Sequence, residues 1–217
     1  MKKILFCMQA LVASLLLTAC LHDDNEVFDE SAAQRIEKAV TADKALLESA
    51  PNGWELHLWT EPKYTGGGYT YLMKFKDGKV TASSEISNTN AEEESYYTYS
   101  ITEGPTISFD TYNSILDHFR FVSAVFTNAR GGDIEFIFLK EENGVVTLRG
   151  RTSNNLMTLT KLTGDREALL NKLRENTQAL NSKGLNPITV QGTQVDLTLF
   201  PSYRQLVFSY GGNTVQR

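Results

Sequence analysis

The three histidines of this sequence, His22, His57 and His118, are its first candidates for binding a metal ion or moving a proton. A catalytic zinc site needs about three protein ligands and an open fourth position, often with two ligands in a local pair such as HExxH. No such pair occurs, and 61 residues separate His57 from His118. We therefore expect neither a metal site nor a cofactor. His57 is instead expected beside Glu55 on the polar face of a strand, and His118 near the end of a short helix.

The motifs of nucleophilic catalysis and of phosphate binding are also missing. A serine nucleophile commonly lies on a GxSxG elbow, which does not occur in the sequence. Gly66-Gly67-Gly68 lacks the lysine and the following helix of a phosphate-binding loop. This run of glycines therefore predicts a flexible turn between two strands.

Carboxylates that could act in pairs occur at Asp133 and Glu135 and in the run Glu92–Glu94. Residues two apart on a strand share a face whatever their role, and the glutamate run predicts a solvated loop. We therefore expect no enzymatic activity. The weakest alternative is a hydrolase that combines Asp133 with Glu55 and His57.

Aromatic residues are more suggestive, because exposed rings can stack on a sugar or a peptide. Seven of them lie in neighbouring segments: Trp59, Tyr64, Tyr69, Tyr71, Tyr96, Tyr97 and Tyr99. Strand alternation assigns Tyr69, Tyr71, Tyr97 and Tyr99 to the core. The remaining three, Trp59, Tyr64 and Tyr96, are the candidates for ligand contact, with packing at a sheet edge as the alternative.

Both cysteines, Cys7 and Cys20, lie within the first 20 residues. The body of the protein therefore has no disulfide and no thiolate for catalysis. Lys2 and Lys3 precede a run of 16 uncharged residues, 4–19, which is shorter than the roughly 20 apolar residues of a membrane-spanning helix. This pattern is typical of a signal peptide over residues 1–19.

The four residues Leu17-Thr18-Ala19-Cys20 resemble the lipobox of bacterial lipoproteins. The resemblance implies that Cys20 is lipidated and becomes the first residue of the mature chain. Each buried CH₂ of an acyl chain contributes about 0.8 kcal/mol to membrane binding, so two or three chains hold a protein on the bilayer. The alternative is an ordinary secretory signal in which the cysteine occurs by chance.

Residues 20–28 are expected to form an acidic tether behind the lipid. Asp23 and Asp24 would each cost about 3 kcal/mol near the centre of a membrane helix, so they oppose insertion. Together with Glu26 they resemble the export signal that sends Bacteroidetes lipoproteins to the outer leaflet of the outer membrane. The alternative is a solvated linker that faces the periplasm.

The formal net charge is -5, and removal of residues 1–19, which carry two lysines and no acid, would leave -7. Neutralising phosphates requires clustered lysine and arginine, and no such cluster occurs, so we expect no nucleic-acid partner. The 217 residues are 41% hydrophobic and 22% charged, as is usual for one globular domain.

Hydrophobic periodicity predicts three helices. The first, over residues 29–50, is amphipathic, begins with a capping box of Ser31 and Gln34, and stops at Pro51-Asn52-Gly53. The second, Thr111–Arg120, is short, is capped by Asp110 and buries Tyr112, Ile115, Leu116 and Phe119. The third covers about Asp165–Ser182, and its apolar stripe is Leu169, Leu170, Leu173, Ala179 and Leu180.

Alternating segments predict the strands, with Asp77-Gly78 as a tight hairpin turn. They are residues 54–59, 69–76, 79–84, 96–101, 106–109, 134–140, 145–151, 156–162, 195–200 and 204–210. The segment Ile134–Leu139 is apolar on nearly both faces, which predicts a central strand or one under a helix. Strands joined by short turns favour an α+β fold, an antiparallel β-meander sheet packed with the N-terminal and a later amphipathic helix. We expect one domain over residues 29–217, ending in an incomplete β portion after the glycine turn at 211–212.

Several segments, among them FDESAAQRIEKAV, LLESAPNGWELHLW, EPKYTGGGYTYLMKFKDGKVTASSE, SFDTYNSILDHF, GGDIEFIFL and VTLRGR, resemble a family of lipoproteins from gut Bacteroidetes. That family is defined by domain of unknown function 4302, and the resemblance covers Phe28–Arg217. It implies that relatives continue into a second β-rich portion and that their genes lie near outer-membrane nutrient importers. It implies no catalytic residues.

The sequence therefore predicts a surface-exposed outer-membrane lipoprotein, a non-enzymatic accessory binding component for nutrient capture. Its partners would be the membrane, through the lipid on Cys20, and components of an importer. The alternative is a structural or assembly lipoprotein that docks a partner protein by strand addition.

Overall fold

The computed structural model describes residues 30–87, 89–101, 104–120, 131–201 and 204–216. The chain forms two compact units, residues 1–38 and 39–217. No helix within the described ranges is long and apolar enough to cross a membrane. The predicted signal peptide, lipobox and export signal lie outside the described residues.

Helix α2 (Ala32–Glu48) begins with the predicted capping box. The backbone N–H of Gln34 donates to Ser31 Oγ at 3.3 Å, and the Ser31 N–H donates to Gln34 Oε1 at 3.0 Å. These two bonds satisfy N–H groups that have no partner within the helix, so the prediction of this helix start is confirmed. Leu47 and Ala50, near the other end, belong to the main hydrophobic core.

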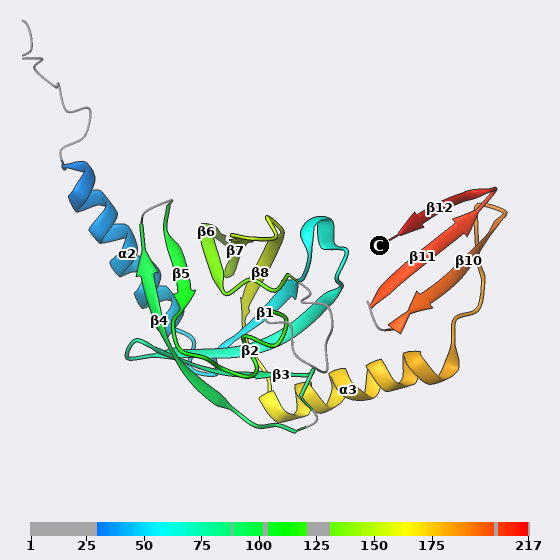
Figure 1. The fold of residues 1–217 in the computed structure, drawn as a ribbon, viewed down its shortest axis with the longest axis horizontal. Coiled ribbons are helices and arrows are strands. Elements are labelled where there is room, and N and C mark those ends of the chain that lie inside the picture. Colours follow the sequence, from blue (N-terminus) through cyan, green and yellow to red (C-terminus); the bar gives the residue numbers. More distant parts are fainter. Residues whose placement is uncertain (1–29, 88, 102–103, 121–130, 202–203, 217) are drawn as a thin grey trace, which may run out of the picture. The chain divides into compact units, whose positions relative to one another are not determined.

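Eight antiparallel strands form a closed barrel, shown in Figure 1. In chain order they are β1 (Trp54–Trp59), β2 (Gly68–Lys76), β3 (Lys79–Ser84), β4 (Glu93–Ser100), β5 (Thr106–Phe109), β6 (Glu135–Glu142), β7 (Val145–Gly150) and β8 (Leu156–Lys161). Each strand pairs with its neighbours in sequence, and β1 also pairs with β8 from Trp54↔Lys161 to His57↔Thr158. The predicted antiparallel strands with two helices are confirmed, and the meander is more than a sheet: its first and last strands pair, which closes it into a barrel.

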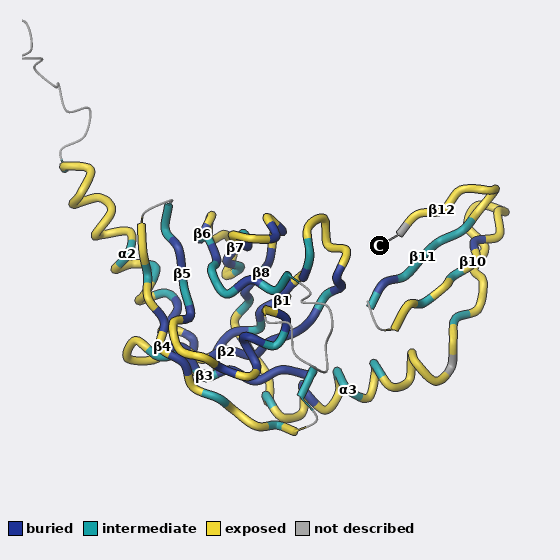
Figure 2. The backbone as a smooth tube through the Cα atoms, in the orientation of Figure 1, coloured by how far each residue is buried: buried dark blue, intermediate teal, exposed yellow. Residues whose placement is uncertain are grey.

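Alternation along the strands fills the barrel with apolar side chains. In β1 the side chains of Trp54, Leu56 and Leu58 are buried, while His57 and Trp59 are exposed. The same core contains Tyr69, Tyr71, Met73, Phe75, Val80, Tyr97, Ile107, Phe136, Phe138, Val146, Leu148, Met157 and Leu159. Figure 2 shows these buried segments concentrated in the barrel strands.

Strand β6 departs from its prediction at its second half. Phe136 and Phe138 are buried, but Leu139 is 43% exposed, and the pairing with β7 shifts between Phe138 and Lys140. Alternation from the buried Phe136 and Phe138 already places Leu139 on the outer face. The irregularity acts on the next residue, Lys140, which alternation alone would place inside and which is exposed.

Helix α3 (Arg166–Lys183) packs on the outside of the barrel through a second apolar cluster of Leu72, Leu162 and Leu170. Its first turn is capped by Asp165, whose Oδ1 accepts the Ala168 N–H at 2.6 Å. The predicted stripe is buried only at its beginning, since Leu180 is 47% exposed.

Residues 111–120 form turns and not the predicted helix. Asn113, and not Asp110, organises them: its Oδ1 accepts the N–H groups of Ile115 and Leu116 at 3.0 and 3.1 Å. Ile115, Leu116 and Phe119 are buried as predicted, whereas Tyr112 is 73% exposed. A polar side chain that binds nearby backbone groups competes with helix formation.

The last four strands form a separate sheet in the order β12-β11-β10-β9. They are β9 (Ile188–Val190), β10 (Thr193–Phe200), β11 (Gln205–Tyr210) and β12 (Asn213–Gln216). Strand β9 was not predicted from the sequence. Within the described part of this sheet only Val195 and Gln205 are buried, and several apolar side chains are exposed: Ile188, Val190, Phe200, Tyr210 and Val215.

Candidate functional site

A groove of about 640 Å³ lies where β1 ends, beside the loop of residues 60–67 and the start of β11. Its described lining consists of Trp59, Lys63, Tyr64, Thr65, Gly67, Leu156, Arg204 and Gln205. A hollow of about 230 Å³ shares Trp59 and Arg204 with it and extends along the outer face of the barrel to His57 and Thr70. We call the two together the Trp59 groove. Its size falls in the range of small-molecule sites.

Two of the three predicted ligand-contact residues meet in this groove. Trp59 and Tyr64 are 37% and 43% exposed, and their ring centroids lie 5.7 Å apart with the planes at 88°. Leu156, 50% exposed, adds an apolar wall, and its N–H donates to Tyr64 Oη at 3.2 Å. Tyr96 is also exposed but does not line the groove; Lys79 Nζ lies 5.2 Å from its ring centroid.

Glycines allow the indole ring to lie against β2. A Cβ atom on Gly68 would come within 2.7 Å of the Trp59 ring, and one on Gly66 within 2.2 Å of Thr60 Oγ1. The loop is closed by Gly66 N–H donating to Thr60 O at 3.0 Å and Thr60 N–H donating to Gly67 O at 3.1 Å. The glycine run therefore forms the predicted turn between the two strands, and the turn is closely packed and closed by hydrogen bonds.

The loop also holds three residues in a conformation that side chains rarely adopt. Glu61, Lys63 and Tyr64 have φ angles of 55°, 60° and 65°. Asn155, which is 2% exposed, fixes this shape: its Nδ2 donates to Trp59 O at 3.2 Å and to Glu61 O at 2.6 Å. Each strained residue costs about 1–3 kcal/mol, and such residues cluster at functional sites.

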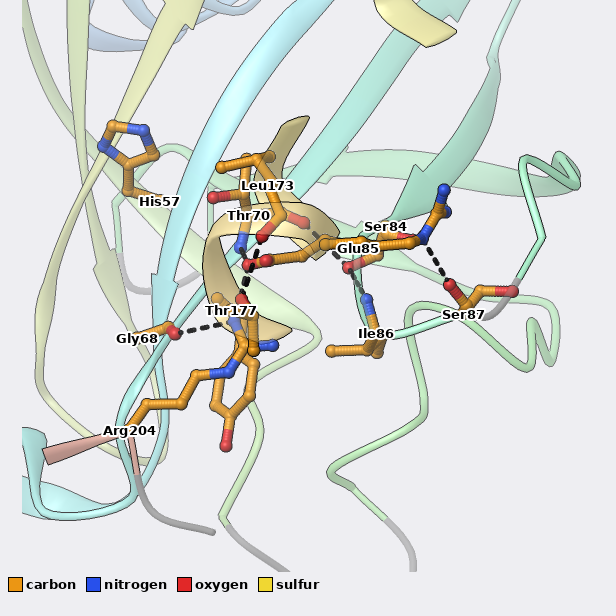
Figure 3. Close-up of polar contacts among 12 residues, drawn as sticks. His57, Gly68, Thr70, Ser84, Glu85, Ile86, Ser87, Leu173, Thr177 and Arg204 are labelled. Carbon is orange, nitrogen blue, oxygen red and sulfur yellow. Dashed lines mark hydrogen bonds and ion pairs between the residues drawn. The ribbon is translucent and has the colours of Figure 1, made fainter. Parts of the chain in front are cut away.

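Arg204 also lines the groove, and Figure 3 shows its polar contacts. Its Nη1 donates to Glu85 Oε1 at 2.6 Å and to Gly68 O at 3.5 Å, and the guanidinium lies 4.5 Å from the Tyr69 ring centroid. Glu85 is 8% exposed and also accepts the Thr70 N–H at 2.9 Å. The arginine is therefore fixed from behind by a buried carboxylate.

The neighbouring Gln205 completes the attachment of this segment to the loop. Its side chain is 6% exposed, and its Nε2 donates to Thr65 O. The start of β11 is thus bound to the 60–67 loop as well as to Glu85. The groove has one wall from the barrel and one from this segment.

The sequence matches the family model described as Domain of unknown function (DUF4302) over residues 24–213. The chain belongs to the DUF4302 family. No curated protein and no solved structure is significantly similar to it. The match spans the barrel, α3 and the strands β9, β10 and β11, so the whole Trp59 groove lies inside the DUF4302 domain.

The histidine and carboxylate candidates of this DUF4302 protein have other contacts. His57 Nε2 lies 2.9 Å from Glu55 Oε1 on the outer face of β1, as predicted, and its Nδ1 lies 3.4 Å from Thr158 Oγ1. Asp133 is 3% exposed and accepts the Thr152 N–H at 2.6 Å, so it holds the turn between β7 and β8.

The glutamate run does not form the predicted solvated loop. Glu93 and Glu94 belong to β4, and Glu92 precedes it. Glu93 Oε2 accepts the Ser114 N–H at 2.7 Å, Glu94 pairs with Lys79 at 2.6 Å, and Glu92 pairs with Arg166. Across the described ranges, no three histidine, cysteine, aspartate or glutamate side chains gather as metal ligands would.

Sequence reasoning did not find Lys63, Leu156, Arg204 or Gln205. Leu156 is the first residue of β8, and nothing in its sequence context separates it from the other apolar residues of that strand. Arg204 and Glu85 are 119 residues apart in the chain, so no local pattern connects them. The three consecutive glycines were the one available signal, because such a run permits close backbone packing.

Proposed function

We propose that this DUF4302 protein is a lipid-anchored, surface-exposed binding protein of the outer membrane that holds its ligand in the Trp59 groove. It would serve as an accessory component of nutrient capture beside an importer. The observation that carries the proposal is the convergence of two exposed aromatic rings, an apolar wall and a fixed arginine on one concave surface. The lipobox at Cys20 supports the anchor.

In this proposal the groove binds a sugar and does not convert it chemically. The flat rings of Trp59 and Tyr64 can cover the apolar face of a sugar ring, and backbone and side-chain polar groups around them can bind its hydroxyls. The Asn155 contacts hold the backbone at Trp59 and Glu61 in place before the ligand arrives, so little backbone freedom is lost on binding. The proposal assigns no catalytic step and no cofactor.

Alanine substitution of one ring tests the site. The purified full-length chain in detergent would be titrated calorimetrically against a panel of plant and host oligosaccharides. Trp59→Ala is expected to weaken binding about tenfold or more, as is usual for a central aromatic contact. Tyr96→Ala is the matched control, because it removes an exposed ring outside the groove. Equal effects of the two substitutions would refute the site.

The anchor can be tested with the two cysteines. In cells fed an alkyne-tagged fatty acid, Cys20→Ala should abolish labelling and Cys7→Ala should leave it intact. Protease treatment of intact cells should then degrade the wild-type domain. Replacement of Asp23, Asp24 and Glu26 by alanine should protect it. Complete protection of the wild type would remove the surface assignment.

The second candidate function is docking of a partner protein by strand addition. The observation that favours it is the four-stranded sheet: among the described strands β9 and β12 are its two edges, and both carry exposed apolar residues. Val215→Pro in β12 would remove a backbone donor from this strand. If importer components co-purify with the wild type and not with this variant, the docking function gains support over the groove.

A further inference from the structure

The charged residues of the Trp59 groove are all of one kind. Its described lining includes the cations Lys63 and Arg204 and contains no aspartate or glutamate. This contrasts with the whole chain, whose net charge is -5. A concave surface lined by one sign of charge concentrates ligands of the opposite sign.

Lys63 supplies a charge that the protein does not balance. Its side chain is exposed at the rim, and within the described ranges it forms no ion pair, whereas Lys79 and Lys140 pair with Glu94 and Glu142. The nearest carboxylate in the loop, Glu61, does not line the groove and accepts a hydrogen bond from Thr65 Oγ1 at 3.3 Å. Lys63, whose φ is 60°, therefore brings an ammonium group without an ion pair to the same groove that Trp59 and Tyr64 line.

Arg204 contributes hydrogen-bond donors to the groove and little net charge, because the carboxylate of Glu85 balances the charge of its guanidinium. Its side chain is 24% exposed, and among the described residues it donates only through Nη1. The guanidinium is planar by its own delocalisation, and the two contacts of Nη1 fix its orientation. A fixed, planar guanidinium suits a carboxylate, which accepts two parallel hydrogen bonds.

From this arrangement we infer that the ligand is an acidic saccharide, a sugar ring that bears a carboxylate. The inference rests on the proposed function of the groove and names its ligand class. The rings of Trp59 and Tyr64 take the apolar face of the sugar, and Lys63 and Arg204 take the carboxylate. A neutral sugar would use the rings alone.

The test compares oligogalacturonate with its methyl ester, which has the same rings and no charge. The full-length chain should bind the acid at least tenfold more tightly than the ester. Lys63→Gln should weaken binding of the acid about fivefold and leave the ester unchanged, and Lys63→Arg should restore most of the loss. Lys172→Gln, which removes an exposed lysine of α3 outside the groove, is the matched control.

Glucuronate-containing oligosaccharides would be titrated in parallel, because the proposal concerns the carboxylate of the ligand and not which sugar isomer carries it. Equal binding of acid and ester, still lost in Trp59→Ala, would overturn the acidic class and leave the sugar groove standing. Failure of all acidic sugars to bind, or stronger binding of a peptide with a free carboxylate, would also overturn it. Binding that survives Trp59→Ala would refute the groove itself.

Discussion

Gly68 is the residue on which the position of the Trp59 ring depends. Because an added Cβ would lie 2.7 Å from the ring, Gly68→Ala is expected to displace the indole and weaken saccharide binding about tenfold. Stability should change little, since the ring can swing toward solvent. Calorimetric titration and thermal melting measure the two effects. Gly164→Ala, where a Cβ meets nothing within 4 Å, is the control; unchanged affinity in Gly68→Ala would contradict the assignment.

Single residues of the site could be predicted only where the alternation of a strand indicates which side chains are exposed. Alternation in 54–59 places Trp54 inside and Trp59 outside, and the structure confirms both, with 0% and 37% of the side chain exposed. Lys63 could not be recognised, because a positive φ at a lysine has no sequence signature. Arg204 meets Glu85 only through the fold.

Among the elements, the β2–β3 hairpin shows a clear match between sequence and structure. Asp77 and Gly78 have φ angles of 51° and 75°, the two left-handed residues of a type I′ turn. An alanine at the second position would adopt a left-handed conformation that costs about 1–2 kcal/mol. Gly78→Ala should therefore lower the free energy of unfolding by about 1 kcal/mol in urea denaturation. Gly164→Ala should be neutral or slightly stabilising; equal values for the two would contradict the turn.

Hydrogen bonds from tyrosine hydroxyls of strand β4 to carboxylates of helix α2 connect these two elements. Tyr97 Oη donates to Glu48 Oε1 at 3.1 Å, and burial, with Glu48 nearby, raises the pKa of Tyr97 to about 12. An unfolded tyrosine loses its proton near pH 10, so the folded state binds the proton more tightly and its stability falls as the pH rises from about 10 to 12.

Tyr97→Phe should accordingly be less stable than the wild type by about 1 kcal/mol at pH 8, where the hydrogen bond is intact. The difference should shrink as the pH approaches 12. The Phe75–Tyr97 ring contact, at 5.1 Å between centroids, is kept by the substitution. Urea denaturation across this pH range provides the measurement. A stability difference that does not depend on pH would contradict the assignment.

Elements with a strong period were predictable, as was the capping box that begins α2, whereas the turns at 111–120 were not. The strands of the barrel alternate clearly because only their inner face is buried. Residues 111–120 have helical spacing of apolar residues, but the Asn113 side chain binds the backbone N–H groups of Ile115 and Leu116 in turns. Strand β9 has three exposed residues and hence no alternation to detect.

For the whole molecule, the structure predicts two levels of stability. The eight barrel strands surround one continuous core, whereas the described part of the four-stranded sheet buries only Val195 and Gln205. In hydrogen exchange, amides of β2 and β7 should be protected to the level of global unfolding, and those of β10 and β11 should exchange orders of magnitude faster. Equal protection of both sheets would contradict this difference.

Closure of the barrel could not be predicted from the sequence. Each strand in turn shows the same alternation whether the sheet is open or closed, and closure requires Trp54 to pair with Lys161 across more than a hundred residues. The antiparallel order followed from short turns, but the groove arises only when the loop after β1 meets the start of β11. Trp59 and Tyr64 are the predicted part of this site, and Arg204 and Gln205 are residues that only the fold brings to it.

The most direct test of the ligand groove uses the two indole N–H resonances of the ¹⁵N-labelled chain. Trp54 Nε1 donates to Leu47 O at 2.7 Å inside the core, while Trp59 lies in the groove. Addition of oligogalacturonate should shift the Trp59 indole resonance saturably and leave that of Trp54 in place, with Trp59→Phe giving the assignment. Saturable binding by calorimetry with an unmoved Trp59 resonance would contradict the site.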